Sequence, residues 1–257
     1  MVISDPLKLA FIHIPKCAGS TVRSALAPFD SHRFGEYFDY PDGRRQAFDH
    51  LPLADVRAYL PQVYEKIADY ESYAILREPR ERFASALAQY LRSFQKMKLS
   101  RRSGALFRQK ALEVLAKLAI PEERRALEMM FFQKQTAFVT VDGRQIVRNL
   151  YGFGELHRLS SDLRLRHGIA VDLSERRNQA RVEDSAAVRA LKDFGRPLYR
   201  RILSEERTGR MRLALRTVTG NSPLQLYRQL FDDAEVRAFV DDYYAEDRVL
   251  YEALGRQ

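Results

Sequence analysis

A short strand that runs into a tight turn and then a helix lies near the start of the chain, and it constrains the fold more than any other feature. Residues 7–14 form an apolar run rich in β-branched and aromatic residues, and Pro15 ends it, which is typical of a buried strand. Helically spaced apolar residues follow. The same plan returns at residues 73–76, after which Pro79 suits the first position of a helix. This repeat predicts an α/β fold with a central parallel sheet.

The rest of the chain predicts a largely helical carboxyl-terminal half. Residues 30–49 have weak periodicity, so we expect them to be irregular. We expect helices over residues 53–59, 105–139 (with a new helix from Pro121), 155–167 (capped by Gly168) and from Asp232 to the carboxyl end, and a short strand over 151–154. No repeat or low-complexity tract divides the chain, and residues 1–257 are predicted to form a single domain.

The positive net charge of the chain favours anionic ligands. The chain has 43 Lys and Arg against 34 Asp and Glu, a formal net charge of +9. Such a field attracts nucleotides, acidic glycans, nucleic acid or a membrane surface. The single cysteine excludes an internal disulfide framework and fits a reducing compartment. Without a signal-peptide pattern or an apolar run of ~20 residues, we expect a soluble, cytoplasmic protein with no membrane span.

The first turn has the composition of an anion site. Lys16 precedes a glycine and two hydroxyl residues, Gly19-Ser20-Thr21, where free amides at a helix start favour negative charge. The usual nucleotide-triphosphatase pattern places the lysine after a glycine and directly before Ser or Thr, so that pattern fails. Arg77 also stands where an aspartate that holds magnesium would follow the second strand. ATP hydrolysis is therefore disfavoured.

Two alternatives remain open at this stage. Cys17 and Arg23 have the spacing of cysteine-dependent phosphatases, in which a thiolate attacks phosphorus and an arginine binds its oxygens. That chemistry also needs a general acid, and no Asp-Pro segment follows the turn. Cys17 is otherwise a small residue that fills the turn. The net charge of +9 permits a non-enzymatic polyanion-binding protein instead.

The second turn adds another anion site. Arg77 follows the second strand, and Ser85 lies one turn into the next helix, roughly 200° from Phe83 and off the apolar stripe, where it is free for a ligand or for water. In an open parallel sheet, ligands bind outside the carboxyl ends of the strands, so Lys16 and Arg77 are expected to face one crevice. Two such sites predict one ligand with two separated phosphates.

Together the motifs IHIPKCAGST and AILREPRERFASAL resemble the sulfotransferases that use 3′-phosphoadenosine 5′-phosphosulfate (PAPS), in particular the branch that includes carbohydrate 2-O-sulfotransferases. Further resemblance lies in residues 151–155, in the basic pair Arg177-Asn178 and in residues 243–252. The resemblance implies a P-loop-like three-layer fold. It assigns the 5′-phosphosulfate to Lys16, Cys17, Ala18, Gly19, Ser20 and Thr21, and the 3′-phosphate to Arg77 and Ser85. Arg177 and Asn178 are further candidates for nucleotide contact.

The resemblance also implies the reaction: transfer of a sulfuryl group from PAPS to a hydroxyl acceptor, expected to be a carbohydrate or glycan, without a metal and without nucleic acid as a partner. Lys16 would stabilise the departing bridging oxygen. His50 is the expected catalytic base, because an imidazole titrates near neutral pH. Glu36 and Asp49 are weaker candidates. His13, within the first strand, is expected to be a packed or orienting residue.

Overall fold

A mixed four-stranded sheet forms the centre of the protein. The computed structural model describes residues 1–257 apart from 33, 98, 100–102, 122–126, 174–223 and 256–257. Along the sheet the strands are β1 (Val2–Ser4), β2 (Leu9–Ile12), β5 (Glu71–Leu76) and β8 (Asn149–Gly152). The pairs β2–β5 and β5–β8 are parallel, which confirms an α/β fold, but β1–β2 is antiparallel. The predicted parallel sheet is therefore present in β2, β5 and β8 but not in β1, because the short connection over residues 5–8 allows only an antiparallel return.

The central strands are covered on both faces. Residues 73–76 of β5 are at most 1% exposed, which explains their continuous apolar run. Helix α3 (Pro61–Asp69) packs against β2 and β5, while α6 (Leu156–His167) and α11 (Ala245–Leu254) pack against β8. The predicted first strand is shorter than expected, and the strand predicted over 151–154 lies two residues earlier.

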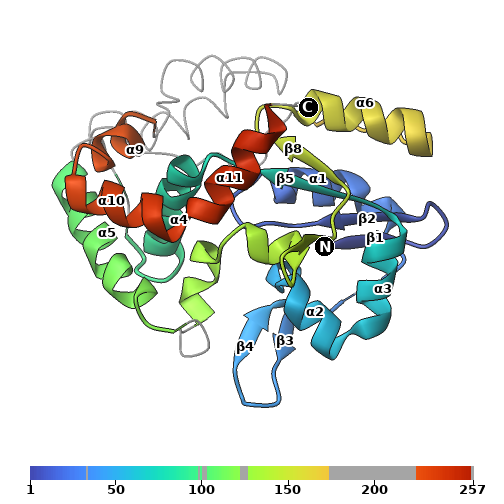
Figure 1. Ribbon diagram of the computed structural model, residues 1–257, viewed down its shortest axis with the longest axis horizontal. Helices are drawn as coiled ribbons and strands as arrows, with labels where there is room; N and C mark the ends of the chain where they lie inside the picture. Colours follow the sequence, from blue (N-terminus) through green and yellow to red (C-terminus); the bar gives the residue numbers. More distant parts are fainter. Residues whose placement is uncertain (33, 98, 100–102, 122–126, 174–223, 256–257) are drawn as a thin grey trace, which may run out of the picture.

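A second group of helices gathers to one side of the sheet (Figure 1). It consists of α4 (Pro79–Ser93), α5 (Gly104–Leu118), α9 (Leu224–Leu230) and α10 (Ala234–Tyr243), which contact one another. Helix α4 begins with Pro79, and the Glu78 carboxylate accepts hydrogen bonds from the amides of Arg80 and Glu81. Its neighbours bury it on nearly every side. Ser85 is consequently only 6% exposed, so the expectation that it is free for water was wrong.

Residues 30–49 are more regular than expected. They contain an antiparallel hairpin of β3 (Tyr37–Asp39) and β4 (Arg45–Ala47), which projects from the body of the molecule (Figure 1). The turn contains Gly43 with φ of 84°, a conformation that favours glycine. Each strand has three residues; β3 is largely exposed, and the buried residue of β4 is the polar Gln46, so neither strand gives a clear hydrophobic period.

Most of the other predicted helices are present. Helix α2 (Leu53–Tyr59) has the expected bounds, and Gly168 ends α6 with φ of 69°. The cap of the last region is Asp233 rather than Asp232, because its side chain accepts from the amide of Val236. The chain then breaks into α10 and α11 instead of one helix. The residues that follow Pro121 in its predicted helix, 122–126, and the basic pair Arg177-Asn178 lie outside the described residues.

The remaining described elements are short. They are the helix α1 (Gly19–Leu26), the strands β6 (Thr140–Val141) and β7 (Arg144–Gln145), and the 3-10 segments Ala27–Phe29, Phe48–His50, Leu127–Phe132 and Thr136–Phe138.

Candidate functional site

The two predicted anion turns leave the sheet side by side. Strands β2 and β5 are parallel neighbours, and Ile12 pairs with Ala74 in their register. The turn over residues 13–19 and the turn that begins at Arg77 therefore emerge at the same edge. This is the edge where open α/β sheets bind ligands.

The first turn holds an unusual backbone. Lys16 and Ala18 have φ of 67° and 62°, a left-handed conformation that costs a non-glycine residue about 1–3 kcal/mol. No side chain caps α1, and among the described residues the amides of Ala18, Gly19 and Ser20 have no hydrogen-bond acceptor. Successive amides in such a turn form a concavity that favours anions. The strain and the open amides together favour an anion-binding role for this turn.

Gly19 is required by its histidine neighbour. A Cβ atom at this position would lie 1.9 Å from Cδ2 of His13. The His13 ring is buried against the turn, as expected for a packed residue, and it meets the His50 ring edge-on with 4.7 Å between centroids. The predicted base is thereby placed beside the first turn.

His50 has the properties of a neutral imidazole, and within the described residues one of its ring nitrogens has no hydrogen-bond partner. Its Nδ1 lies 3.4 Å from the carbonyl oxygen of His13, to which it donates, so the lone pair is on Nε2. Burial lowers the pKa of His50 to about 4, against the opposing effect of that hydrogen bond. Of the weaker candidates, Asp49 pairs with Arg23 and the terminal ammonium, and Glu36 is exposed on the hairpin side.

Lys16 is held by a residue that the sequence did not indicate. Its Nζ donates to Oε1 of Gln89 at 3.2 Å, and the Arg92 guanidinium donates to the same oxygen. Burial, reinforced by the charges of Arg92 and Arg77, lowers the pKa of Lys16 to about 8. Gln89 and Arg92 follow Ser85 at i+4 and i+7 and so share its face of α4, a spacing that could have indicated them.

Gln135 joins the two turns. Its Oε1 accepts from the amide of Arg77 at 2.9 Å and from the thiol of Cys17 at 3.2 Å, while its Nε2 donates to the carbonyl of Arg77 at 2.9 Å. The backbone amide of Gln135 donates to the buried carboxylate of Asp247 at 2.8 Å. Burial raises the pKa of the Cys17 thiol to about 12. Cys17 is thus a neutral anchor of the turn.

The second turn positions Arg77 between an aromatic ring and a carboxylate. The guanidinium lies 4.5 Å from the ring centroid of Phe153, and its Nε and Nη2 each lie 3.3 Å from Oε2 of Glu81. These contacts leave Nη1 available within the part of the chain that is described. Arg77 is close enough to Lys16 to lower its pKa, so the structure brings both predicted cations together. Arg177 and Asn178 lie outside the described residues.

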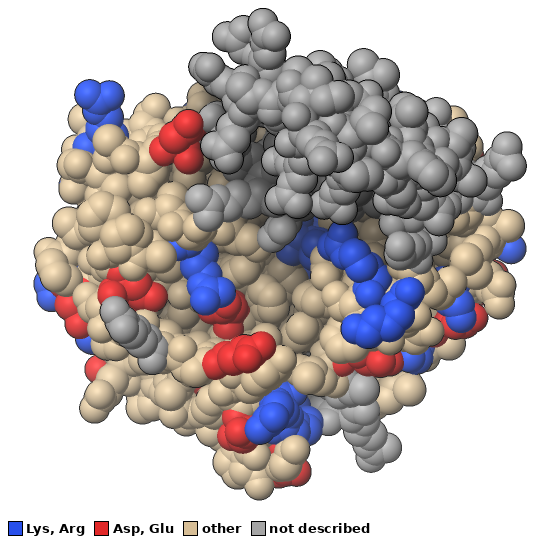
Figure 2. Space-filling model, turned by 180° about the vertical axis from the view of Figure 1, so that it is seen from behind, with Lys and Arg blue, Asp and Glu red and all other residues tan. Residues whose placement is uncertain are grey.

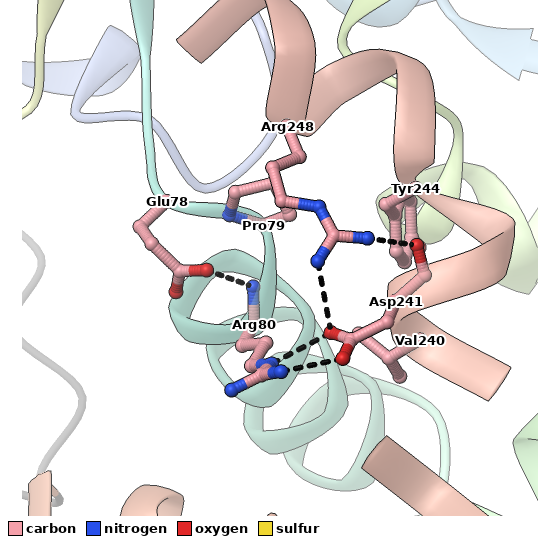
Figure 3. A pocket seen from close by; sticks show the side chains of 7 residues that line it. All are labelled: Glu78, Pro79, Arg80, Val240, Asp241, Tyr244 and Arg248. Atoms are coloured by element: carbon pink, nitrogen blue, oxygen red, sulfur yellow. Dashed lines mark hydrogen bonds and ion pairs between the residues drawn. The ribbon is translucent and has the colours of Figure 1, made fainter. Parts of the chain in front are cut away.

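A separate surface pocket of about 210 Å³ lies where α4 begins (Figure 3). Asp241 accepts from Nε and Nη2 of Arg80 at 2.7 and 2.5 Å, and Arg248 donates to the Asp241 carbonyl at 2.7 Å. Glu78 already accepts the first amides of α4. The polar groups of this pocket satisfy one another, so we place the candidate site at the turns instead.

Basic side chains also gather in the middle of one face of the molecule (Figure 2). In the described part of the chain, no group of three or more His, Cys, Asp or Glu side chains is arranged to hold a metal ion. No described helix has the length and apolar character to cross a bilayer.

Comparisons with protein-family models, with curated proteins and with solved structures gave no match.

Proposed function

We propose that the protein is a sulfotransferase that moves a sulfuryl group from PAPS to a hydroxyl acceptor. The observation that carries the proposal is the joining of two cationic turns through Gln135, with Lys16 on one and Arg77 on the other. A donor with separated 5′ and 3′ phosphate groups matches two such sites at one sheet edge. We extend the proposal to a P-loop-like three-layer fold.

Each group in the first turn has a part in the proposed reaction. The amides of residues 18–20 bind the 5′-phosphosulfate oxygens, and Lys16 leaves Gln89 to hydrogen-bond the oxygen that bridges phosphorus and sulfur. As the bond from sulfur to that oxygen breaks, the ammonium stabilises the negative charge that develops there. The 3′-phosphate binds at Arg77 and Ser85. Positioning and charge neutralisation supply most of the rate enhancement in such in-line transfers.

His50 receives the proton of the acceptor. The acceptor oxygen forms its bond to sulfur as its hydrogen passes to Nε2, and the adenosine bisphosphate leaves with the bridging oxygen. The Nδ1 contact with the His13 carbonyl supports this assignment, because it orients the ring with Nε2 unprotonated. The anionic donor beside His50 raises its pKa from the low value of the free protein, which makes it a stronger base.

We propose a carbohydrate or glycan as the acceptor. The β3–β4 hairpin runs directly into the 3-10 segment that ends at His50, and it exposes an aromatic ring next to a cation. Tyr37 is 42% exposed, and the Arg45 guanidinium lies 5.4 Å from its ring centroid. A surface of this kind suits an acidic sugar.

The phosphatase alternative is not favoured by the contacts of its two residues. A nucleophilic cysteine needs a lowered pKa and access to the ligand, whereas the Cys17 thiol is 1% exposed with a raised pKa. Arg23 forms an ion pair with Asp49. The polyanion-binding alternative stays a prediction from the net charge.

The test is calorimetric titration with 3′,5′-adenosine bisphosphate, with AMP as the control ligand. We expect the bisphosphate to bind much more tightly than AMP, and equally negligible binding of both would refute the proposal. Lys16→Ala and Arg77→Ala should each weaken binding, whereas Arg57→Ala, which removes an exposed arginine paired with Asp142, should not.

The rate of sulfuryl transfer tests the role of His50 as the base, separately from ligand binding. His50→Ala should bind the bisphosphate like the unchanged protein but lose about 10²–10⁴-fold in transfer rate from radiolabelled PAPS. A screen of hydroxyl acceptors with that donor would identify the substrate. A fully active His50→Ala enzyme would exclude His50 as the base.

A further inference from the structure

Helix α9 covers the second anion site. It packs against α4 and α5, and its Tyr227 side chain is 4% exposed. The Tyr227 ring stacks on Phe107 of α5, with 6.0 Å between centroids and 14° between planes. This packing fixes the ring, so the hydroxyl has a defined position beside Ser85.

The Tyr227 hydroxyl is buried without a regular hydrogen bond. No acceptor or donor in the described part of the chain bonds it with good geometry, although the Ser85 hydroxyl lies close enough to interact. Burial raises the pKa of Tyr227, partly offset by Arg77, Ser85 and Arg92, so the phenol keeps its proton at neutral pH. A buried phenol normally has a partner, and an unsatisfied one destabilises the folded protein.

The Ser85 hydroxyl can accept a hydrogen bond from the Tyr227 hydroxyl. A serine hydroxyl has one hydrogen to donate and two lone pairs that accept. If Ser85 accepts from Tyr227, its single hydrogen is left for an anion at Arg77. Hydrogen bonds in such a chain also polarise and strengthen one another.

We propose that Tyr227 is a positioning residue of the phosphate site: it donates to Oγ of Ser85, which then donates to the 3′-phosphate of the nucleotide. This inference rests on the proposed function. It adds α9 to the site and makes the packing of α9 on α4 a determinant of selectivity for a 3′-phosphorylated nucleotide. No motif in the sequence marks this tyrosine.

The experiment compares Tyr227→Phe with the unchanged protein. Phenylalanine keeps the stack on Phe107 and removes only the hydroxyl. We expect affinity for 3′,5′-adenosine bisphosphate to fall about three- to tenfold, as for loss of one neutral hydrogen bond. Affinity for AMP, which lacks the 3′-phosphate, should stay within about twofold. Thermal stability without ligand should not fall, since the hydroxyl has no regular partner there.

The matched control is Tyr40→Phe, which removes the hydroxyl of another buried tyrosine, one that donates to Asp55 at 2.6 Å. It should leave the affinities for the bisphosphate and for AMP unchanged.

A further measurement distinguishes a hydrogen bond relayed through Ser85 from direct contact between Tyr227 and the ligand. In a Ser85→Ala background, Tyr227→Phe should weaken bisphosphate binding no further, because the hydroxyl it supports is absent.

The results distinguish a failure of the Tyr227 inference from a failure of the proposed function. Unchanged bisphosphate affinity in Tyr227→Phe, an equal loss for AMP, or full additivity with Ser85→Ala would each overturn the inference while the proposed function stands. If the unchanged protein does not prefer the bisphosphate over AMP, the proposed function fails and takes this inference with it.

Discussion

Under the proposed function, the lowered pKa of Lys16 predicts that donor binding depends on pH. Its ammonium lies partly buried beside Arg92 and Arg77, and these surroundings lower the pKa to about 8. A phosphate or phosphosulfate group in the first turn would reverse that effect, because it offsets the repulsion among the three cations. The protonated form of Lys16 is therefore the form that binds the anion, and the bound state holds its proton more tightly.

The magnitude follows from the pKa. The protonated fraction of Lys16 in the free protein falls from about 0.9 at pH 7 to about 0.1 at pH 9, so affinity for 3′,5′-adenosine bisphosphate should fall about tenfold over this range. At pH 8 about half a proton should be taken up for each ligand bound. The ligand phosphates have their second ionisation near pH 6 and change little above pH 7.

Isothermal titration calorimetry measures both quantities. Titrations at pH 8 in two buffers with different ionisation enthalpies give the number of protons taken up, and a series from pH 7 to 9 gives the slope of affinity. Lys16→Arg is the matched control, since a guanidinium stays charged throughout and should remove the pH dependence. Affinity that is constant from pH 7 to 9, with no proton uptake, would refute the role of Lys16 as the binding cation.

Three further predictions concern the framework of the site. Gly19→Ala places a methyl group against the His13 ring and should lower the free energy of unfolding by about 1–3 kcal/mol in urea titrations. Adding His13→Ala to this variant should recover part of the loss. If the effects of the two substitutions on the free energy of unfolding are simply additive, the steric account is contradicted. Gln135→Leu leaves the buried amide and carbonyl of Arg77 without partners, at about 1–3 kcal/mol each, and an unchanged denaturation midpoint would disprove that cost. Asp247→Ala leaves the fully buried Arg82 without its carboxylate neighbour at 3.8 Å, so we expect a loss of about 3–5 kcal/mol by the same measurement. Asp247→Asn also removes the charge but keeps an oxygen that can accept from the amides of Gln135 and Thr136, so it should still lose most of that stability; a loss far below that of Asp247→Ala would argue against a charge effect.

The sequence predicts the part of the fold that long apolar patterns encode. The continuous runs of β2 and β5, the Pro79 start of α4 and the glycine end of α6 are local signals, and each is present in the structure. Strand β1 and the β3–β4 hairpin were missed because three-residue strands are too short for a hydrophobic period. The mixed character of the sheet depends on β1 and was missed with it.

The candidate site likewise contains residues that the sequence indicates and residues that it does not. Lys16, Gly19 and Arg77 are recognisable because the first turn and the end of the second strand are local features of the chain. Gln135 is not, because its contact with Cys17 joins residues 118 positions apart, and nothing near it in the sequence marks it. The low exposure of Ser85 likewise depends on a helix that follows more than 130 residues later, so an amphipathic pattern within α4 alone gave the wrong environment.

The network around Gln135 explains how a strained turn persists without glycine at its left-handed positions. Lys16 and Ala18 each carry a cost of about 1–3 kcal/mol, and Cys17 stands between them with its side chain buried and hydrogen-bonded to Gln135. A thiol suits this place because it packs like a small apolar group and still donates a weak hydrogen bond. Since Gln135 also binds both backbone groups of Arg77, the conformation of one turn and the position of the other are set by a single side chain. A substitution at Gln135 should therefore perturb both turns together.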